Sequence, residues 1–193
     1  MAEIVVIGYA GLSGSREIYA REPFRSALKK RYPARFLKAL EPEPQDGAGT
    51  EEAERVRALF QEAGVLREHV SEAREGGVFA ALWRLLKQNG FGAAFCQQKI
   101  PLRQQTVELC EQYAVSPYRL SSAGCFVCLS EEGERLCRMA EDAGLPAAVI
   151  GSTERGPAIR RVDGEETAYL RRPEPDALCR ILGEEKGGAS YDE

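Results

Sequence analysis

The sequence predicts an α/β (α+β) protein in which helices pack on a mixed β-sheet. Short β-branched runs that end at glycine, such as Glu3 to Ile7, are typical of buried strands. Segments with apolar residues at helical spacing alternate with these runs. Near the end of the chain, Asp163-Gly164 separates two further strand-like runs, which is a strong hairpin signal. The 193 residues, 44% of them hydrophobic, suffice for one substantial core, so we expect one domain over 1–183 and a polar tail over 184–193.

The first strand leads into a glycine-rich turn and then a helical stretch over 16–40. Pro23 and Pro33 divide this stretch into two or three short helices, because each proline ring removes an amide donor and crowds the preceding turn. Residues 41–50 are rich in proline, glycine and acidic residues, and they predict a loop.

Amphipathic helices dominate the middle of the chain. Thr50 is expected to cap a helix that Gly64 ends. A second helix begins at Gly77 and ends at Asn89-Gly90, and residues 91–96 follow as a strand. A third helix is predicted over about 103–114.

The last third has β-α-β order. Residues 125–129 predict a central strand, Ser130 caps the next helix, and residues 147–150 form another strand. The hairpin strands cover 158–162 and 165–170, and a short helix follows Pro173 and Pro175.

Composition narrows the classes of partner. With 26 basic and 30 acidic side chains the net charge is -4, and no basic block could neutralise a run of phosphates, so nucleic acid is not expected. No apolar stretch approaches the length of a membrane span, and no secretory leader precedes the first strand, so we expect a cytoplasmic protein without a membrane partner. The six cysteines lie mostly in apolar stretches, which suits buried thiols in a reducing compartment.

Four motifs in a fixed order carry a resemblance to a known superfamily. They are Gly-Tyr-Ala-Gly-Leu-Ser-Gly-Ser at 8–15, Glu-Gly-Gly-Val at 75–78, Ser-Pro-Tyr-Arg-Leu-Ser-Ser at 116–122 and Ala-Ala-Val-Ile-Gly at 147–151. Over about residues 4 to 183 the chain resembles the C-terminal domain of the aminoimidazole ribonucleotide synthase (PurM) and hydrogenase maturation factor (HypE) superfamily, in its AIR synthase-related branch. The resemblance implies a PurM C-terminal-domain-like mixed sheet.

The resemblance also implies an ATP-dependent chemistry that needs a second domain. In these enzymes an N-terminal domain supplies the acidic metal and nucleotide residues, and the C-terminal domain closes over the phosphates. The resemblance does not extend to that N-terminal domain here. That N-terminal domain is either naturally absent or missing from this sequence, and both alternatives stay open. ATP and magnesium are therefore expected as cofactors only together with a partner domain.

One motif departs from the superfamily pattern. Glu72 and Arg74 stand where the superfamily usually has an aspartate and a threonine, and the only histidine, His69, lies two residues too early. A guanidinium competes with a metal ion for the same position, so catalysis is expected to be weakened or lost. Arg74 could instead bind phosphate through its planar fork. No metal site is predicted, and Glu72 and Glu75 are the only carboxylates considered as ligands.

The candidate anion-binding groups lie at two helix starts and in one connecting segment. Free amides and the positive end of the helix dipole make such starts usable for phosphate, although a plain strand-to-helix turn explains the same glycines equally well. The hydroxyl and guanidinium groups of the connecting segment suit phosphate oxygens, or they satisfy backbone groups at a strand entry. The candidates are Gly11, Gly14, Ser15, Arg74, Gly76, Gly77, Arg119, Ser121 and Ser122. No catalytic residue is assigned.

The Cys125-x-x-Cys128 spacing does not predict a metal or disulfide site. Side chains alternate along a strand, so these two thiols should point to opposite faces and pack in the core. His69 lacks partners for a catalytic triad in this pattern and is expected at the surface or as a capping residue.

Two functions remain. The first is a non-catalytic or degenerate binding and interaction module that keeps the fold, exposes the apolar face once covered by the N-terminal domain, and self-associates through it. The alternative is a half-enzyme that completes an ATP-dependent site with a separately encoded N-terminal AIR synthase-like domain or subunit.

Overall fold

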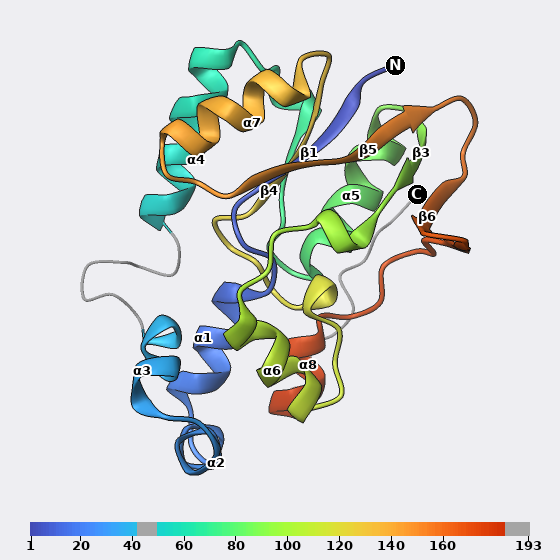
Figure 1. Cartoon of the computed structure of the whole chain (residues 1–193). Coiled ribbons are helices and arrows are strands. Elements are labelled where there is room, and N and C mark those ends of the chain that lie inside the picture. Colours follow the sequence, from blue (N-terminus) through green and yellow to red (C-terminus); the bar gives the residue numbers. More distant parts are fainter. Residues whose placement is uncertain (42–49, 184–193) are drawn as a thin grey trace.

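The computed structural model describes residues 1–41 and 50–183, and in these ranges seven strands form one mixed sheet (Figure 1). The strands are β1 (Glu3–Ile7), β2 (Val70–Glu72), β3 (Gly92–Phe95), β4 (Phe126–Ser130), β5 (Ala147–Glu154), β6 (Ile159–Asp163) and β7 (Glu166–Tyr169). Their order is β2-β4-β1-β5-β3-β6-β7. Neighbouring strands run antiparallel except β3 and β6, which are parallel. The predicted fold class is confirmed.

Eight helices are described besides short 3-10 turns. They are α1 (Leu12–Ala20), α2 (Phe24–Arg31), α3 (Ala34–Leu37), α4 (Thr50–Ala63), α5 (Gly77–Gln88), α6 (Gln104–Gln112), α7 (Gly133–Asp142) and α8 (Ala177–Leu182). The 3-10 turns are η1 (Lys38–Leu40), η2 (Arg67–His69), η3 (Gln97–Lys99) and η4 (Pro117–Arg119). No helix in the described ranges is both long and apolar enough to cross a membrane.

The sheet is sandwiched between two helical layers because its strands alternate their apolar side chains. In β1, Ile4 and Val6 face the core beneath α5, whereas Val5 and Ile7 face the core beneath α4 and α7. Figure 1 shows α4 and α7 together on one side of the sheet and α5 on the other. A third apolar cluster joins α1, α2, α3, α6 and α8 beyond one end of the sheet.

Most predicted elements have the expected type and place. The prolines divide the stretch that follows the first turn into α1, α2, α3 and η1. Cys125 and Cys128 lie in the two opposite cores, as alternation required, and both thiols are free. The predicted tail at 184–193, the capping role of Thr50, and the predicted loop except Glu41 fall outside the described residues.

The strand predicted after Cys125 is an interior strand, because β4 pairs with β2 on one side and with β1 on the other. Two local predictions are wrong. Ser130 does not cap α7: it ends β4, and the helix begins at Gly133, whose amide donates to Glu3 Oε2 at 2.7 Å. The hairpin turn is shifted by one residue, because Asp163 still pairs with Glu166 and leaves Gly164-Glu165 as the loop.

Candidate functional site

The two glycine corners lie on either side of one short segment, residues 117–122. Gly11 is the N-cap of α1 with φ 69°, and a Cβ there would stand 2.8 Å from the Pro117 carbonyl oxygen. Gly77 begins α5 with φ 64°, and a Cβ there would stand 2.5 Å from the Tyr118 carbonyl oxygen. The glycines therefore let the chain's own backbone approach both helix starts closely.

The amides of the α1 corner donate within the chain. Gly11 N donates to Ser122 Oγ at 2.7 Å, and this hydroxyl in turn donates to the Leu120 carbonyl. Gly14 N donates to the Ser121 carbonyl at 2.9 Å. Ser15 donates through both its amide and its hydroxyl to the Gly11 carbonyl. The candidate phosphate contacts of this corner are thus occupied by residues 121 and 122 and by the first turn of the helix.

The α5 corner holds a carboxylate. Asp176 Oδ2 accepts from Gly76 N at 2.7 Å, and Oδ1 accepts from Leu178 N at 2.8 Å and from Ser121 N at 3.3 Å. Only 9% of Asp176 is exposed. Burial raises the pKa of this carboxyl above its ordinary value, while the amide hydrogen bonds oppose the rise. The remaining glycine of the corner, Gly77, donates to the Arg74 carbonyl.

The candidate arginines are paired with carboxylates. Arg119 forms an ion pair with Glu174. Arg74 Nε lies 3.0 Å from Glu72 Oε2, and Arg57 contacts the same oxygen at 3.0 Å. Glu72 is therefore neutralised by two guanidinium groups, which disfavours a metal ion beside it. Within the described residues no group of three or more possible metal ligands comes together.

The structure thus brings the candidates into two groups. Gly76, Arg119 and Ser121 contact the Asp176 and Glu174 carboxylates, and Gly77 follows at the start of α5. The other group, Gly11, Gly14, Ser15 and Ser122, lies on the other side of segment 117–122. Arg74 is apart from both, with its side chain 66% exposed and directed to Glu72. Glu75 is exposed, and its charge contributes to the raised pKa of Asp176.

Sequence reasoning missed Asp176, which is the polar centre of this region. A signal was present, because an aspartate directly before a short predicted helix and after Pro175 is a typical N-cap. The side chain does cap α8. Its simultaneous contact with α5 and with Ser121 depends on tertiary structure, and no local pattern predicts it.

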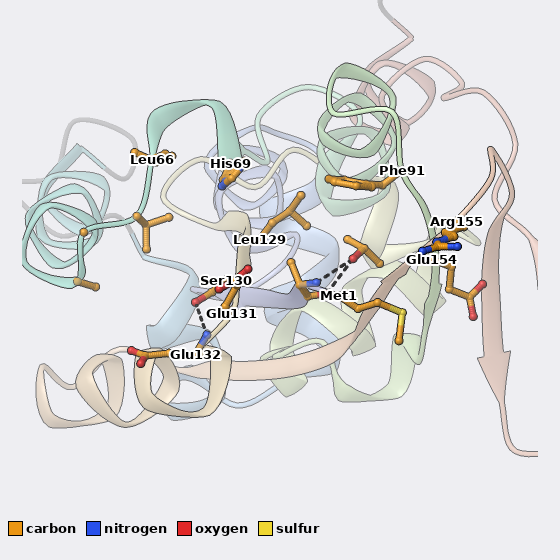
Figure 2. A pocket seen from close by; sticks show the side chains of 15 residues that line it. Met1, Leu66, His69, Phe91, Leu129, Ser130, Glu131, Glu132, Glu154 and Arg155 are labelled. Carbon is orange, nitrogen blue, oxygen red and sulfur yellow. Dashed lines mark hydrogen bonds between the residues drawn. The ribbon is translucent and has the colours of Figure 1, made fainter.

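A second feature lies at the opposite end of β1 from α1. It is a hollow of about 740 Å³ whose rim includes three exposed apolar side chains, Met1, Leu66 and Phe91, above the buried Leu129 (Figure 2). Among the described residues one other large apolar side chain, Tyr169, is comparably exposed, and it does not line the hollow. An exposed apolar face is predicted from the sequence, but the sequence does not indicate which residues form it.

Charges of both signs surround this hollow. Figure 2 shows Glu131 and Glu132 on one side and Arg155 on the other, with His69 beside Leu129. Glu154 lies next to Arg155, and its carboxylate pairs with Arg160. His69 lies in η2, so the lone histidine is near neither glycine corner but at the rim of the hollow. A mixture of apolar and charged groups is more typical of a contact surface for another protein than of a site for a small polar ligand.

Solved structures identify the fold. E. coli HypE, a hydrogenase maturation protein, superposes with a TM-score of 0.68 at 17% identity over 92% of this chain and 52% of its own. This chain has the fold of one part of HypE and one part of PurL. HypE in its complex with HypF gives 0.64 at 17% identity over 89% of this chain and 53% of its own. T. maritima PurL complexed with FGAR gives 0.58 at 18% identity over 91% of this chain and 28% of its own.

These comparisons confirm the predicted fold and leave the activity to be argued from the site. The chain spans about half the length of the HypE structures and about a quarter of the PurL structure. No protein-family model and no curated protein sequence matches it.

Proposed function

We propose that this chain is a non-catalytic binding and interaction module that associates through the hollow at the start of β1, with a second copy of itself as the partner. The observation that carries the proposal is the gathering of Met1, Leu66 and Phe91 around one hollow. Contiguous exposed apolar groups are costly to leave in water and are typical of contact surfaces. The cytoplasm is the proposed location, and neither nucleic acid nor a membrane is a proposed partner.

Loss of catalysis is supported by the polar groups at the glycine corners. The amides that would approach phosphates at Gly11, Gly14 and Gly76 donate to groups of the chain itself. Arg74, which replaces a neutral hydroxyl of the superfamily pattern, pairs with Glu72. A protein with these contacts needs no bound nucleotide to satisfy its buried donors.

Self-association is supported by the charges around the hollow. Glu131 and Glu132 lie across it from Arg155 (Figure 2). In a two-fold symmetric pair, each patch meets the same patch of the other copy in reverse, so Arg155 of one copy can face the acidic side of the other. The apolar rim would then be covered in both copies at once.

Sedimentation velocity over a concentration series tests the proposal. The native chain should form a dimer, and Leu66→Asp or Phe91→Asp should shift it to monomer, because a carboxylate would be desolvated at the interface. Leu66 is 55% and Phe91 39% exposed, so neither substitution opens the core. Tyr169→Asp, at a side chain 67% exposed on β7, is the matched control and should remain a dimer. If the native chain stays monomeric at high concentration, the proposal of self-association is wrong.

The alternative is a half-enzyme, favoured by the extent of the likeness: this chain covers 52% of E. coli HypE. In that case a separately encoded N-terminal AIR synthase-like domain or subunit covers the hollow, and ATP with magnesium binds only to the pair. Isothermal titration with ATP and magnesium, with this chain alone and with such a domain, separates the two. Heat only in the presence of the domain favours the half-enzyme, and no heat in either case removes it.

A further inference from the structure

The end of α2 and the short helices that follow it carry an exposed group of cations, which we call the basic patch. It consists of Lys29, Lys30, Arg31, Arg35 and Lys38, with no acidic residue between them. All five residues are exposed. Without these five, 21 of the 26 basic residues remain against 30 acidic ones, so the patch has a charge of +5 and the rest of the chain a charge of -9. The patch is therefore a local region of positive charge on an acidic protein.

Local structure accounts for only part of this charge. The three cations of α2 lie in its last turn, where they interact favourably with the helix dipole, and Arg31 lies over the Tyr32 ring. Arg35 and Lys38 lie on the four-residue α3 and on η1, which are too short for a comparable dipole. Within the described residues, none of the five cations forms an ion pair or a side-chain hydrogen bond. Their charges are available to a partner.

Apolar side chains on the other side of the segment fix the patch in place. Leu28, Leu37 and Leu40 are buried in the third apolar cluster. Tyr32 and Phe36 pack against the same cluster, and their rings stack with centroids 5.0 Å apart, which joins the end of α2 to α3. The cations therefore lie on a packed surface and do not depend on a partner to be brought together.

The distribution of charge favours a short acidic partner over an extended anionic surface. Exposed charges act over about 8 Å at physiological ionic strength. The eight residues of α2 have a length of about 12 Å. A nucleic-acid duplex or an anionic bilayer extends well beyond this length and meets the rest of the chain, whose charge is -9. A bilayer would also bury little apolar area, because no large apolar side chain of residues 29–38 is exposed.

A second copy of the chain fits the hollow better than it fits the basic patch. Glu131 and Glu132 lie at the hollow, and a contact between them and the patch of another copy would join two different surfaces. Such contacts form open chains unless the rotation closes a ring. Figure 1 shows α2 and α3 at the end of the molecule remote from the N-terminus, whereas Met1 lines the hollow. The patch and the hollow are separate surfaces.

We propose that the basic patch binds a short acidic segment of another protein and is a second contact surface besides the hollow. An extended segment of about four to six residues spans about 13–20 Å, which is comparable with the length of the patch. Glutamate and aspartate side chains pair with guanidinium groups through two parallel hydrogen bonds and with lysine as a point charge. The proposal does not depend on self-association, because none of the five cations lines the hollow.

Fluorescence anisotropy with a labelled peptide of about eight glutamates tests the proposal. The native chain should bind the peptide in about 50 mM sodium chloride and at least about tenfold more weakly in about 500 mM, because salt screens exposed ion pairs. The double variant Lys30→Glu with Arg35→Glu should bind at least about tenfold more weakly in the lower salt, because two attractions become repulsions. Both positions are exposed, so these substitutions leave the core intact.

A second double variant controls for the total charge. Lys99→Glu with Arg138→Glu replaces the same two residue types at exposed positions of η3 and α7, outside the patch. It changes the net charge by the same amount as Lys30→Glu with Arg35→Glu. It should keep the native peptide affinity within about twofold, because its charges lie beyond the screening length of the patch. If both double variants lose affinity equally, total charge and not the patch determines binding, and the proposal is wrong.

Other anionic partners are compared with the same protein. A labelled DNA duplex of about 20 base pairs and vesicles with about 30% phosphatidylserine should both bind more weakly than the peptide at equal salt. Tighter binding of either, or no binding of the peptide in about 50 mM sodium chloride, overturns the proposal. Leu66→Asp, which tests the hollow, should bind the peptide as the native chain does, so the two proposals fail separately.

Discussion

Replacement of Gly77 by alanine should distinguish two reasons for a glycine at a helix start. The glycine either lets the chain's own backbone approach closely or leaves room for a ligand. The residue has φ 64°, and an added Cβ would lie 2.5 Å from the Tyr118 carbonyl oxygen and 2.7 Å from that of Leu120. Both neighbours are backbone atoms, so neither can rotate away. If the glycine is required by this approach, Gly77→Ala destabilises the fold even without any ligand.

The magnitude follows from two contributions. A left-handed backbone costs a non-glycine residue about 1–2 kcal/mol. Overpacking against atoms that must shift adds about 1–3 kcal/mol. Gly90, at the other end of α5, has φ 70° with nothing within 4 Å of its Cβ position, so Gly90→Ala carries the first contribution alone. The effect of alanine on the unfolded chain is common to both variants and cancels in the comparison.

Urea unfolding followed by the fluorescence of Trp83, the single tryptophan, measures both variants. Trp83 lies on α5 and packs against the core under that helix, so its signal reports on the element concerned. We expect Gly77→Ala to lose about 1–3 kcal/mol more than Gly90→Ala, with an unchanged dependence on urea. Equal losses would refute the close-approach argument and return Gly77 to the ligand-binding explanation.

Two further outcomes follow from buried polar groups and buried thiols. Ser122→Ala should lower the free energy of unfolding by about 1–3 kcal/mol in the same assay, because the buried Gly11 amide loses its acceptor. Ser121→Ala should lower it far less, because Ser121 makes these contacts through its backbone amide and carbonyl. Similar losses for both variants would contradict the role given to the Ser122 hydroxyl. In the native protein a thiol reagent should modify the partly exposed Cys96 and Cys179 and spare the four buried cysteines until unfolding. Burial raises the pKa of Cys110 to about 12 and of Cys137 to about 11, which leaves almost no thiolate near neutral pH. Rapid modification of more than two thiols would show that the cores open.

The features that sequence predicts well here are those encoded within a few residues. The start of α5 at Gly77 and its end near Asn89-Gly90 follow from glycine and apolar spacing alone. The opposite placement of Cys125 and Cys128 follows from strand alternation. These signals are local, so the rest of the fold did not have to be known.

What sequence missed depends on partners distant in the chain. The β-α-β unit of β4, α7 and β5 does not place its two strands side by side, because β1 inserts between them and pairs antiparallel with both. For the same reason the sequence predicts Ser130 as the cap of α7, whereas the first amide of this helix donates to Glu3 of β1. Neither arrangement can be predicted from a local sequence pattern, because each depends on which strands are neighbours in the sheet.

The candidate site shows why a glycine-rich helix start is ambiguous as a functional signal. A phosphate and a polypeptide backbone make the same demands on such a corner, namely a positive φ, no Cβ in the way, and amides that point at an oxygen. At Gly11 and Gly14 the oxygens belong to Ser122 and Ser121. At Gly76 the oxygen belongs to the Asp176 carboxylate. Groups of the chain itself therefore satisfy the amides at both corners, so the glycine pattern alone does not distinguish a ligand site from a close approach of the backbone.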